Sequence, residues 1–166
     1  VTHDLAGRIE GVLDGGASQV GVESTIVACR GGRVELLRPG GIARSDVEAV
    51  LGRPLDAVHA GEAELRAPGM LASHYAPQAA VRLEAREAAT DEHVLDFAGQ
   101  LEATPGTFRL DLSAQGDLRE AAAALFGHLR RLDAAGATRI AVAPIPHAGL
   151  GEAINDRLAR AAAPRS

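Results

Sequence analysis

The segment DLREAAAALFGHLRRLDAAGATRIAVAPI, residues 117–145, decides the fold class of this chain. Asp117 occupies the position of a helix N-cap, because its carboxylate can accept hydrogen bonds from the first backbone N–H groups. Gly136 marks the end of that helix, and the apolar run at 138–145 is typical of a buried strand. The apolar face of the predicted helix is formed by Leu118, Leu125, Leu129 and Leu132. A helix followed directly by a buried strand predicts a crossover in a parallel sheet.

The segments on either side have the same alternating character. A last amphipathic helix is predicted at 150–163, with Ile154 and Leu158 on its apolar face. Short strands are predicted at 81–83, 93–97 and 107–112. Strands alternating with helices indicate an α/β fold, so we expect 80–166 to form a small Rossmann-like domain with a parallel sheet and helical crossovers.

Two helices are predicted in the N-terminal third. The first spans 4–13, and a pair of glycines follows it. Its apolar face would consist of Leu5, Ile9, Val12 and Leu13. The second is a short helix that ends at Leu51, for which Ser45 and Glu48 form a predicted capping box.

A hairpin is predicted between these helices, with strands at about 20–29 and 33–38. Gly31-Gly32 suits a two-residue turn, because such a turn needs positive φ at both positions. That register places Thr25 opposite Arg38, whereas a three-residue turn with a bulge would place Ser24 there.

Hydroxyls and a guanidinium therefore converge at the open end of the hairpin in either register. Arginine can hold a carboxylate or phosphate through two hydrogen bonds, and a hydroxyl can orient a small polar ligand. The alternative is a cross-strand contact between Glu23 and Arg38 on a solvated face, and the residue pattern by itself favours that alternative.

Residues 52–80 show no sustained periodicity and are interrupted by Pro54, Pro68 and Pro77. A connector of this length is more typical of a linker between two units than of a loop within one domain. Tyr75, the only tyrosine, could stack on a base or simply anchor the linker to a domain.

The composition limits the chemistry of the chain. All 17 basic residues are arginines, so the lysine that a Walker-type phosphate loop or a Schiff-base enzyme requires is absent. A formal net charge of -5 argues against a broad nucleic-acid surface. The single cysteine, Cys29, excludes an internal disulfide and is expected to be a free thiol in a reducing cytoplasm. No apolar run reaches membrane-spanning length, and the scattered histidines predict no metal site.

Five collinear blocks carry a resemblance to a known family. They are DGG (14–16), GVESTIV (21–27), LLRPGGI (36–42), PGMLASHYAP (68–77) and GLGEAINDRLARAA (149–162). Together they resemble the threonylcarbamoyl-AMP synthase family in its long form. In that form a YrdC-like catalytic domain is followed by a linker and a smaller Rossmann-like domain.

The resemblance implies a nucleotidyltransferase of the cytoplasm. It would make threonylcarbamoyl-AMP and pyrophosphate from L-threonine, bicarbonate and ATP, with Mg²⁺ accompanying the ATP, and would supply downstream tRNA-modification proteins with the group placed on an adenosine of tRNA. By the family's motifs, Ser24 would contact threonine, and Arg38 would contact ATP. Tyr75 of the HYAP segment would close over the nucleotide, and no general base can be assigned.

The resemblance also implies a domain division. Residues 1–58 resemble only the final third of the catalytic domain, 59–79 correspond to the linker, and 80–166 to the Rossmann-like domain. The family's Lys/Arg nucleotide-binding elements and Ser-x-Asn segment precede the DGG block. We therefore expect an N-terminal part of the catalytic domain to be missing and this chain to be inactive alone. The alternative is a non-catalytic nucleotide-binding, regulatory or interaction module.

Overall fold

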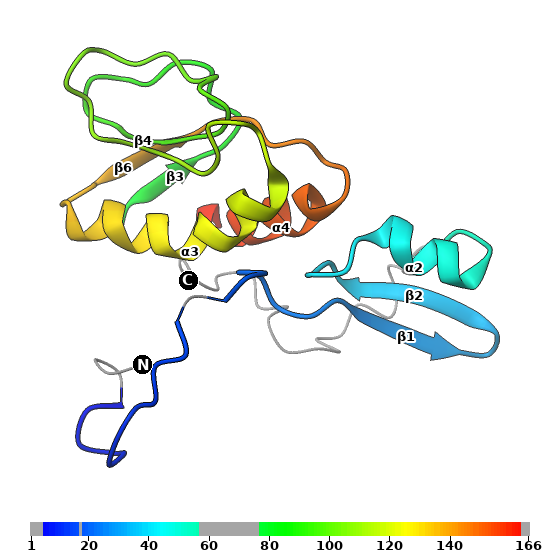
Figure 1. The fold of residues 1–166 in the computed structure, drawn as a ribbon. Helices are drawn as coiled ribbons and strands as arrows, with labels where there is room; N and C mark the ends of the chain where they lie inside the picture. The colour runs from blue at the N-terminus through cyan, green and yellow to red at the C-terminus, as the bar shows by residue number, and fades with distance from the viewer. Residues whose placement is uncertain (1–4, 17, 57–76, 164–166) are drawn as a thin grey trace.

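The computed structural model describes residues 5–16, 18–56 and 77–163, and its C-terminal part contains a parallel sheet (Figure 1). The four strands are β3 (Ala80–Arg82), β4 (His93–Asp96), β5 (Arg109–Asp111) and β6 (Arg139–Val142). They lie in the order β3-β6-β4-β5, and every neighbouring pair is parallel. The predicted α/β class and parallel sheet are confirmed.

Two helices, α3 (Leu118–Ala134) and α4 (Leu150–Ala162), pack side by side along the sheet (Figure 1). Asp117 caps α3 as predicted, since its Oδ1 accepts hydrogen bonds from the N–H groups of Arg119 at 2.7 Å and Glu120 at 2.9 Å. Because these N–H groups favour the charged carboxylate, the pKa of Asp117 lies below its ordinary value.

The predicted order of elements, three short strands followed by a helix, a strand and a last helix, is confirmed. Within 77–163, only the connection from β5 to β6 crosses through a helix. The connection after β4 is instead fixed by a buried carboxylate: Asp96 Oδ1 accepts hydrogen bonds from Phe97 N at 2.8 Å and Leu101 N at 3.0 Å. An isolated parallel β-bridge between Glu87 and Glu102 joins the connection after β3 to the connection after β4. Side-chain and backbone pairing thus replaces the hydrogen bonds that a helix would supply.

The hydrophobic core lies between α3, α4 and the sheet. Its fully buried members include Val94, Leu95, Leu125, Leu132, Ile140, Ile154 and Leu158. Each such side chain contributes roughly 1.5–3 kcal/mol when it is removed from water. The predicted apolar faces at 118–132 and 154–158 are therefore the faces that hold this unit together.

The N-terminal part contains the hairpin of β1 (Ile26–Arg30) and β2 (Arg33–Arg38). The φ angles of Gly31 and Gly32 are 56° and 78°, so the predicted two-residue turn is confirmed. β1 begins at Ile26, later than expected, and a bulge between Ile26 and Val27 interrupts its ladder with β2. That bulge also changes the predicted pairing, since Ile26 lies opposite Arg38.

The short helix α2 (Arg44–Leu51) exists, but the predicted capping box is wrong. The helix begins one residue before Ser45, and Ala43 occupies its N-cap without a side-chain hydrogen bond. Glu48 Oε1 instead accepts a hydrogen bond from Leu55 N at 2.9 Å. This contact fixes the chain that follows α2.

The helix predicted at 4–13 is wrong over its described residues. Apart from the helical residue Leu5, the chain from 6 to 16 runs as turns and irregular backbone. Leu13 is fully exposed, and Ile9 and Val12 are 40% and 48% exposed. An amphipathic pattern forms a stable helix only when its apolar face is buried, and the described residues offer this face no such partner.

Some predictions lie outside the described residues or concern isolated features. Of the predicted linker at 59–79, residues 59–76, including Tyr75, lie outside the described residues. Cys29 is an exposed free thiol, as expected. Among the described residues, no helix combines the length and apolar character that crossing a membrane requires.

Candidate functional site

The open end of the hairpin is a close contact between two backbone segments, 23–25 and 38–42. Gly41 N donates a hydrogen bond to Glu23 O at 2.9 Å. A Cβ on Gly40 would lie 2.3 Å from Glu23 O and 2.4 Å from Thr25 N. Only glycine permits this approach, because any side chain would push the two backbones apart.

The Thr25 hydroxyl joins the same two segments. Its Oγ1 donates to Ile42 O at 2.5 Å and accepts from Ile42 N at 3.0 Å. The Thr25 hydroxyl therefore has a structural role, because its two hydrogen bonds hold the chain in place just before α2.

Arg38 is buried at this junction, with 7% of its surface exposed. Its Nε and Nη2 donate to Ser24 O at 3.2 and 3.0 Å, and Nη2 also lies 3.3 Å from Ser24 Oγ. The predicted convergence of a hydroxyl and the guanidinium is found for Ser24. It arises from hydrogen bonds of the Arg38 side chain to Ser24 and not from either of the two ladder pairings considered.

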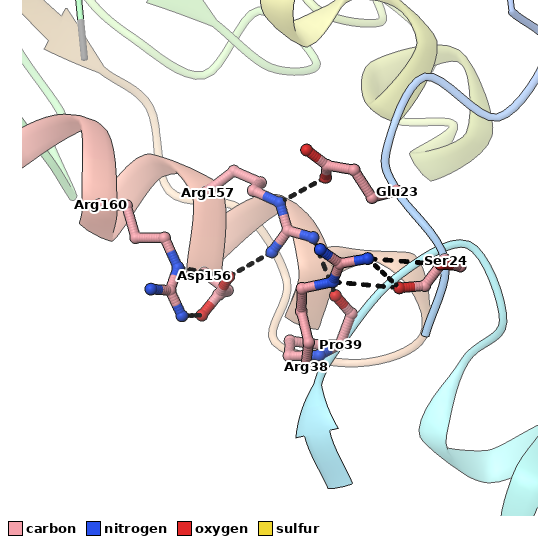
Figure 2. A network of polar contacts seen from close by, with 7 residues as sticks. All are labelled: Glu23, Ser24, Arg38, Pro39, Asp156, Arg157 and Arg160. Carbon is pink, nitrogen blue, oxygen red and sulfur yellow. Dashed lines mark hydrogen bonds and ion pairs between the residues drawn. The ribbon is translucent and has the colours of Figure 1, made fainter. Parts of the chain in front are cut away.

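The side chain of Glu23 is directed toward α4 (Figure 2). Glu23 Oε2 accepts a hydrogen bond from Arg157 Nε at 2.7 Å, and Arg157 Nη2 donates to Pro39 O at 3.2 Å. Arg157 Nη1 is paired with Asp156. Only 2% of the Arg157 side chain is exposed, so this cation is buried between α4 and the two segments of the candidate site.

Asp156 carries a second arginine. Arg160 Nε and Nη2 donate to its two carboxylate oxygens at 3.0 and 2.9 Å. The hydrogen bond to Asp156 raises the pKa of the Arg160 guanidinium above its ordinary value. Two cations and one carboxylate thus meet at one turn of α4, with the Glu23 carboxylate opposite.

A separate ion pair joins α2 to α4. Arg44 Nη2 lies 2.5 Å from Glu152 Oε1, and 42% and 29% of the two side chains are exposed. The hydrogen bond to Glu152 raises the pKa of Arg44. α4 therefore contacts the N-terminal part at two places, one buried and one partly exposed.

A hollow of about 510 Å³ lies beside this ion pair, at the N-terminal ends of α2, α3 and α4. Helix N-termini favour anions, and Arg119 lines the hollow as well. Asp46 and Asp117 also line it, and their negative charges oppose that preference. The electrostatics of the hollow consequently select no anion, and the Arg38–Ser24 junction remains the stronger candidate for ligand binding.

Arg157 is the residue that sequence reasoning missed. It belongs to the block GLGEAINDRLARAA but lies 134 positions from Glu23, so no local pattern links the two. The available signal was its place beside Leu158 and three residues after Ile154, on the buried face of an amphipathic helix. A charge on such a face needs a buried partner.

No group of three or more His, Cys, Asp or Glu side chains in the described ranges is arranged to hold a metal ion. The predicted Mg²⁺ would accompany the ATP, so it needs no such protein cage.

Comparisons with known proteins extend over nearly the whole chain. A family model described as threonylcarbamoyl-AMP synthase, C-terminal domain, matches residues 42–163. The chain is 34% identical over 182 aligned positions to the threonylcarbamoyl-AMP synthase of Bacillus subtilis (strain 168), covering 99% of this chain and 52% of that protein. It is also 34% identical over 176 positions to the threonylcarbamoyl-AMP synthase of Pyrococcus abyssi (strain GE5 / Orsay), with coverages of 97% and 52%. The chain thus spans about half the length of these curated relatives.

The fold has a solved counterpart. It resembles the crystal structure of P. abyssi Sua5 complexed with L-threonine, with a TM-score of 0.78 and 27% sequence identity. The similarity covers 97% of this chain and 52% of that one.

Proposed function

This chain belongs to the threonylcarbamoyl-AMP synthase family, as its five motifs indicated, and from that premise we propose that it is the C-terminal part of such an enzyme. The enzyme would convert L-threonine, bicarbonate and ATP into threonylcarbamoyl-AMP and pyrophosphate in the cytoplasm. Downstream tRNA-modification proteins would use the product. The division into 1–58, 59–79 and 80–166 is part of the same proposal.

One observation carries the proposal for the site: the buried Arg38 held against Ser24 by two motif segments that only glycine lets approach. A guanidinium fixed in this way presents a positive charge of constant position, which suits a phosphate-bearing substrate. Ser24 would orient threonine, Arg38 would contact ATP, and Tyr75 would close over the nucleotide. The L-threonine in the P. abyssi structure supports an amino-acid substrate.

The proposed reaction needs positioning more than side-chain chemistry. The threonine amine would combine with bicarbonate, with loss of water, to form a carbamate, whose oxygen would attack the α-phosphorus of ATP. A bond forms between that oxygen and phosphorus, and the bond to the bridging oxygen of the β-phosphate breaks, releasing pyrophosphate. Mg²⁺ bound with ATP would offset charge on the triphosphate. Arg38 would offset charge near the reacting phosphate, and Ser24 would hold the amino acid in line.

The exposed apolar side chains of the N-terminal part support the idea that more protein packs here. Among the described residues 5–56, Leu36 is the only hydrophobic residue in the buried core. The large exposed hydrophobic side chains include Leu5, Ile9, Val12, Leu13, Val20 and Ile42. Such a surface is what one segment of a larger catalytic domain would present.

The test is pyrophosphate release by the full-length gene product, measured with and without L-threonine and with and without bicarbonate. We expect release that requires both, and none from the 166-residue chain alone. Release that ignores threonine, or no release by an intact and folded full-length protein that still binds ATP, would contradict the synthase proposal. The latter result would favour the non-catalytic module, a second candidate suggested by the self-contained core of 77–163.

A further inference from the structure

The geometry points to Arg157 as a positioning residue for the Ser24–Arg38 site, supplied by α4 of the C-terminal unit. This inference rests on the proposed function and deepens it. It assigns the C-terminal unit a part in binding threonine and ATP, exercised through one buried guanidinium. Arg157 itself contacts neither Ser24 nor Arg38 among the interactions described above; it contacts their neighbours.

The position of its two partners carries the argument. Glu23 directly precedes Ser24, and Pro39 directly follows Arg38. The guanidinium of Arg157 donates from Nε to the Glu23 carboxylate at 2.7 Å and from Nη2 to the Pro39 carbonyl at 3.2 Å (Figure 2). Because the guanidinium is planar and rigid, these two bonds fix the separation of the two segments.

The burial of Arg157 makes the arrangement sensitive to its loss. With 2% of the side chain exposed, the Arg157 guanidinium depends on its protein partners and not on water. Removal of the guanidinium would leave the Pro39 carbonyl and the Glu23 carboxylate without these hydrogen bonds. Both groups belong to the backbone segments that hold Ser24 and Arg38, so their relaxation would displace the predicted ligand-binding side chains.

The other ion pair between α4 and the N-terminal part provides a natural contrast. Arg44 and Glu152 also join the two parts, at 2.5 Å, but both side chains are partly exposed. Arg44 and Glu152 bond to each other, and neither residue belongs to the segments 23–25 and 38–42. A role limited to holding the two parts together would make Arg44 and Arg157 equivalent, whereas a positioning role singles out Arg157.

The experiment compares full-length Arg157→Gln, Arg157→Lys and Arg44→Gln proteins by steady-state pyrophosphate release and by thermal unfolding. For Arg157→Gln we expect the KM for threonine or ATP to rise roughly 3- to 30-fold. Arg157→Lys should recover little, because an ammonium cannot reproduce the planar fork. Arg44→Gln should lower the melting temperature by no more than Arg157→Gln does. It should leave the KM values for threonine and ATP within about twofold of wild type.

One further variant keeps the inference falsifiable if Arg157→Gln fails to fold. Glu23→Gln removes the charge from the more exposed partner, whose side chain is 27% exposed, and should reproduce part of the rise in KM. Unchanged KM values in both Arg157→Gln and Glu23→Gln, or equal changes in Arg44→Gln, would overturn the inference while leaving the synthase proposal intact. A wild-type protein without threonine-dependent release would overturn the proposed function itself.

Discussion

The two parts of the molecule are held together by different means. The unit at 77–163 has a hydrophobic core shared by the sheet, α3 and α4. In the part described at 5–56, Leu36 is the only buried hydrophobic side chain, while Glu35 and Arg38 are buried polar side chains. The first part is specified by periodic apolar burial, and the second by a few polar contacts, by glycines that permit close backbone approach, and by α4.

The largest expected effect tests the hydrophobic side of this comparison. Leu125 is fully buried, so Leu125→Ala should lower the free energy of unfolding by about 2–5 kcal/mol through lost burial and a cavity. Leu13 is fully exposed, so Leu13→Ala should change it by less than about 0.5 kcal/mol. Denaturant unfolding of the two variants of this chain measures both. A large effect of Leu13→Ala would break the comparison.

An effect of similar size is expected at the buried polar contacts of the N-terminal part, where the measured quantity is the affinity for ATP. Arg38→Ala in the full-length protein should weaken ATP binding by roughly 2–5 kcal/mol, because a buried charge-assisted contact is lost. Arg30→Ala, at the exposed far end of the same hairpin, provides the matched control and should leave affinity unchanged. Calorimetric titration with ATP checks both variants, and unchanged affinity of Arg38→Ala would remove Arg38 from the site.

A pH-dependent effect is expected inside the C-terminal unit. Hydrogen bonds from Arg82 at 3.0 and 2.6 Å lower the pKa of Glu92 from an ordinary 4.5 to about 2. A carboxylate whose pKa is lowered in the folded state stabilises the fold at pH values above its pKa in the unfolded chain. This stabilisation should therefore be lost as the pH falls from about 4.5 toward 2. Glu92→Gln should cost about 1.5–3 kcal/mol at pH 7, since a hydrogen-bonded charge is removed.

Unfolding free energies at pH 7 and pH 3 check this prediction. The difference between wild type and Glu92→Gln should shrink at the lower pH. Asp91→Asn is the control, because the Asp91 side chain is 58% exposed and its pair with Arg139 is a surface contact. A difference that stays constant with pH would show that Glu92 is not the titrating group.

The smallest effects compare glycines of the two parts. A Cβ on Gly127, within α3, would meet nothing within 4 Å, so Gly127→Ala should stabilise the chain by about 0.5–1 kcal/mol. Gly52 ends α2 with a φ of 66°, so Gly52→Ala should destabilise it by about 1–2 kcal/mol locally. Melting temperatures that move in the same direction for both variants would contradict this contrast.

The sequence predicted the C-terminal unit well because its signals are local and redundant. The Asp117 cap, the leucines of α3 and the glycine after it all indicated the same helix, and burial confirmed it. No sequence pattern predicted how the connections after β3 and β4 are held in place. Their order depends on buried carboxylates such as Asp96, which accepts hydrogen bonds from backbone N–H groups and pairs with Arg109, contacts that no composition reveals.

The N-terminal part was predicted less well because its order depends on distant residues. The helix at 4–13 had the right periodicity but no described surface on which to bury its apolar face. The hairpin turn followed from Gly31-Gly32, whereas the bulge that places Ile26 opposite Arg38 did not. The five motifs indicated the family correctly, yet they gave no sign that Arg157 bonds to Glu23 and Pro39.

The contact between Glu23 and Arg157 also affects the order in which the chain folds. It joins residues 134 positions apart, and the entropic cost of closing such a loop delays contacts of this range during folding. The ribosome releases the hairpin well before α4, so the segments around Ser24 and Arg38 emerge before the arginine that fixes them. The order of synthesis therefore leaves the binding segments unfinished until the last helix of the unit has docked.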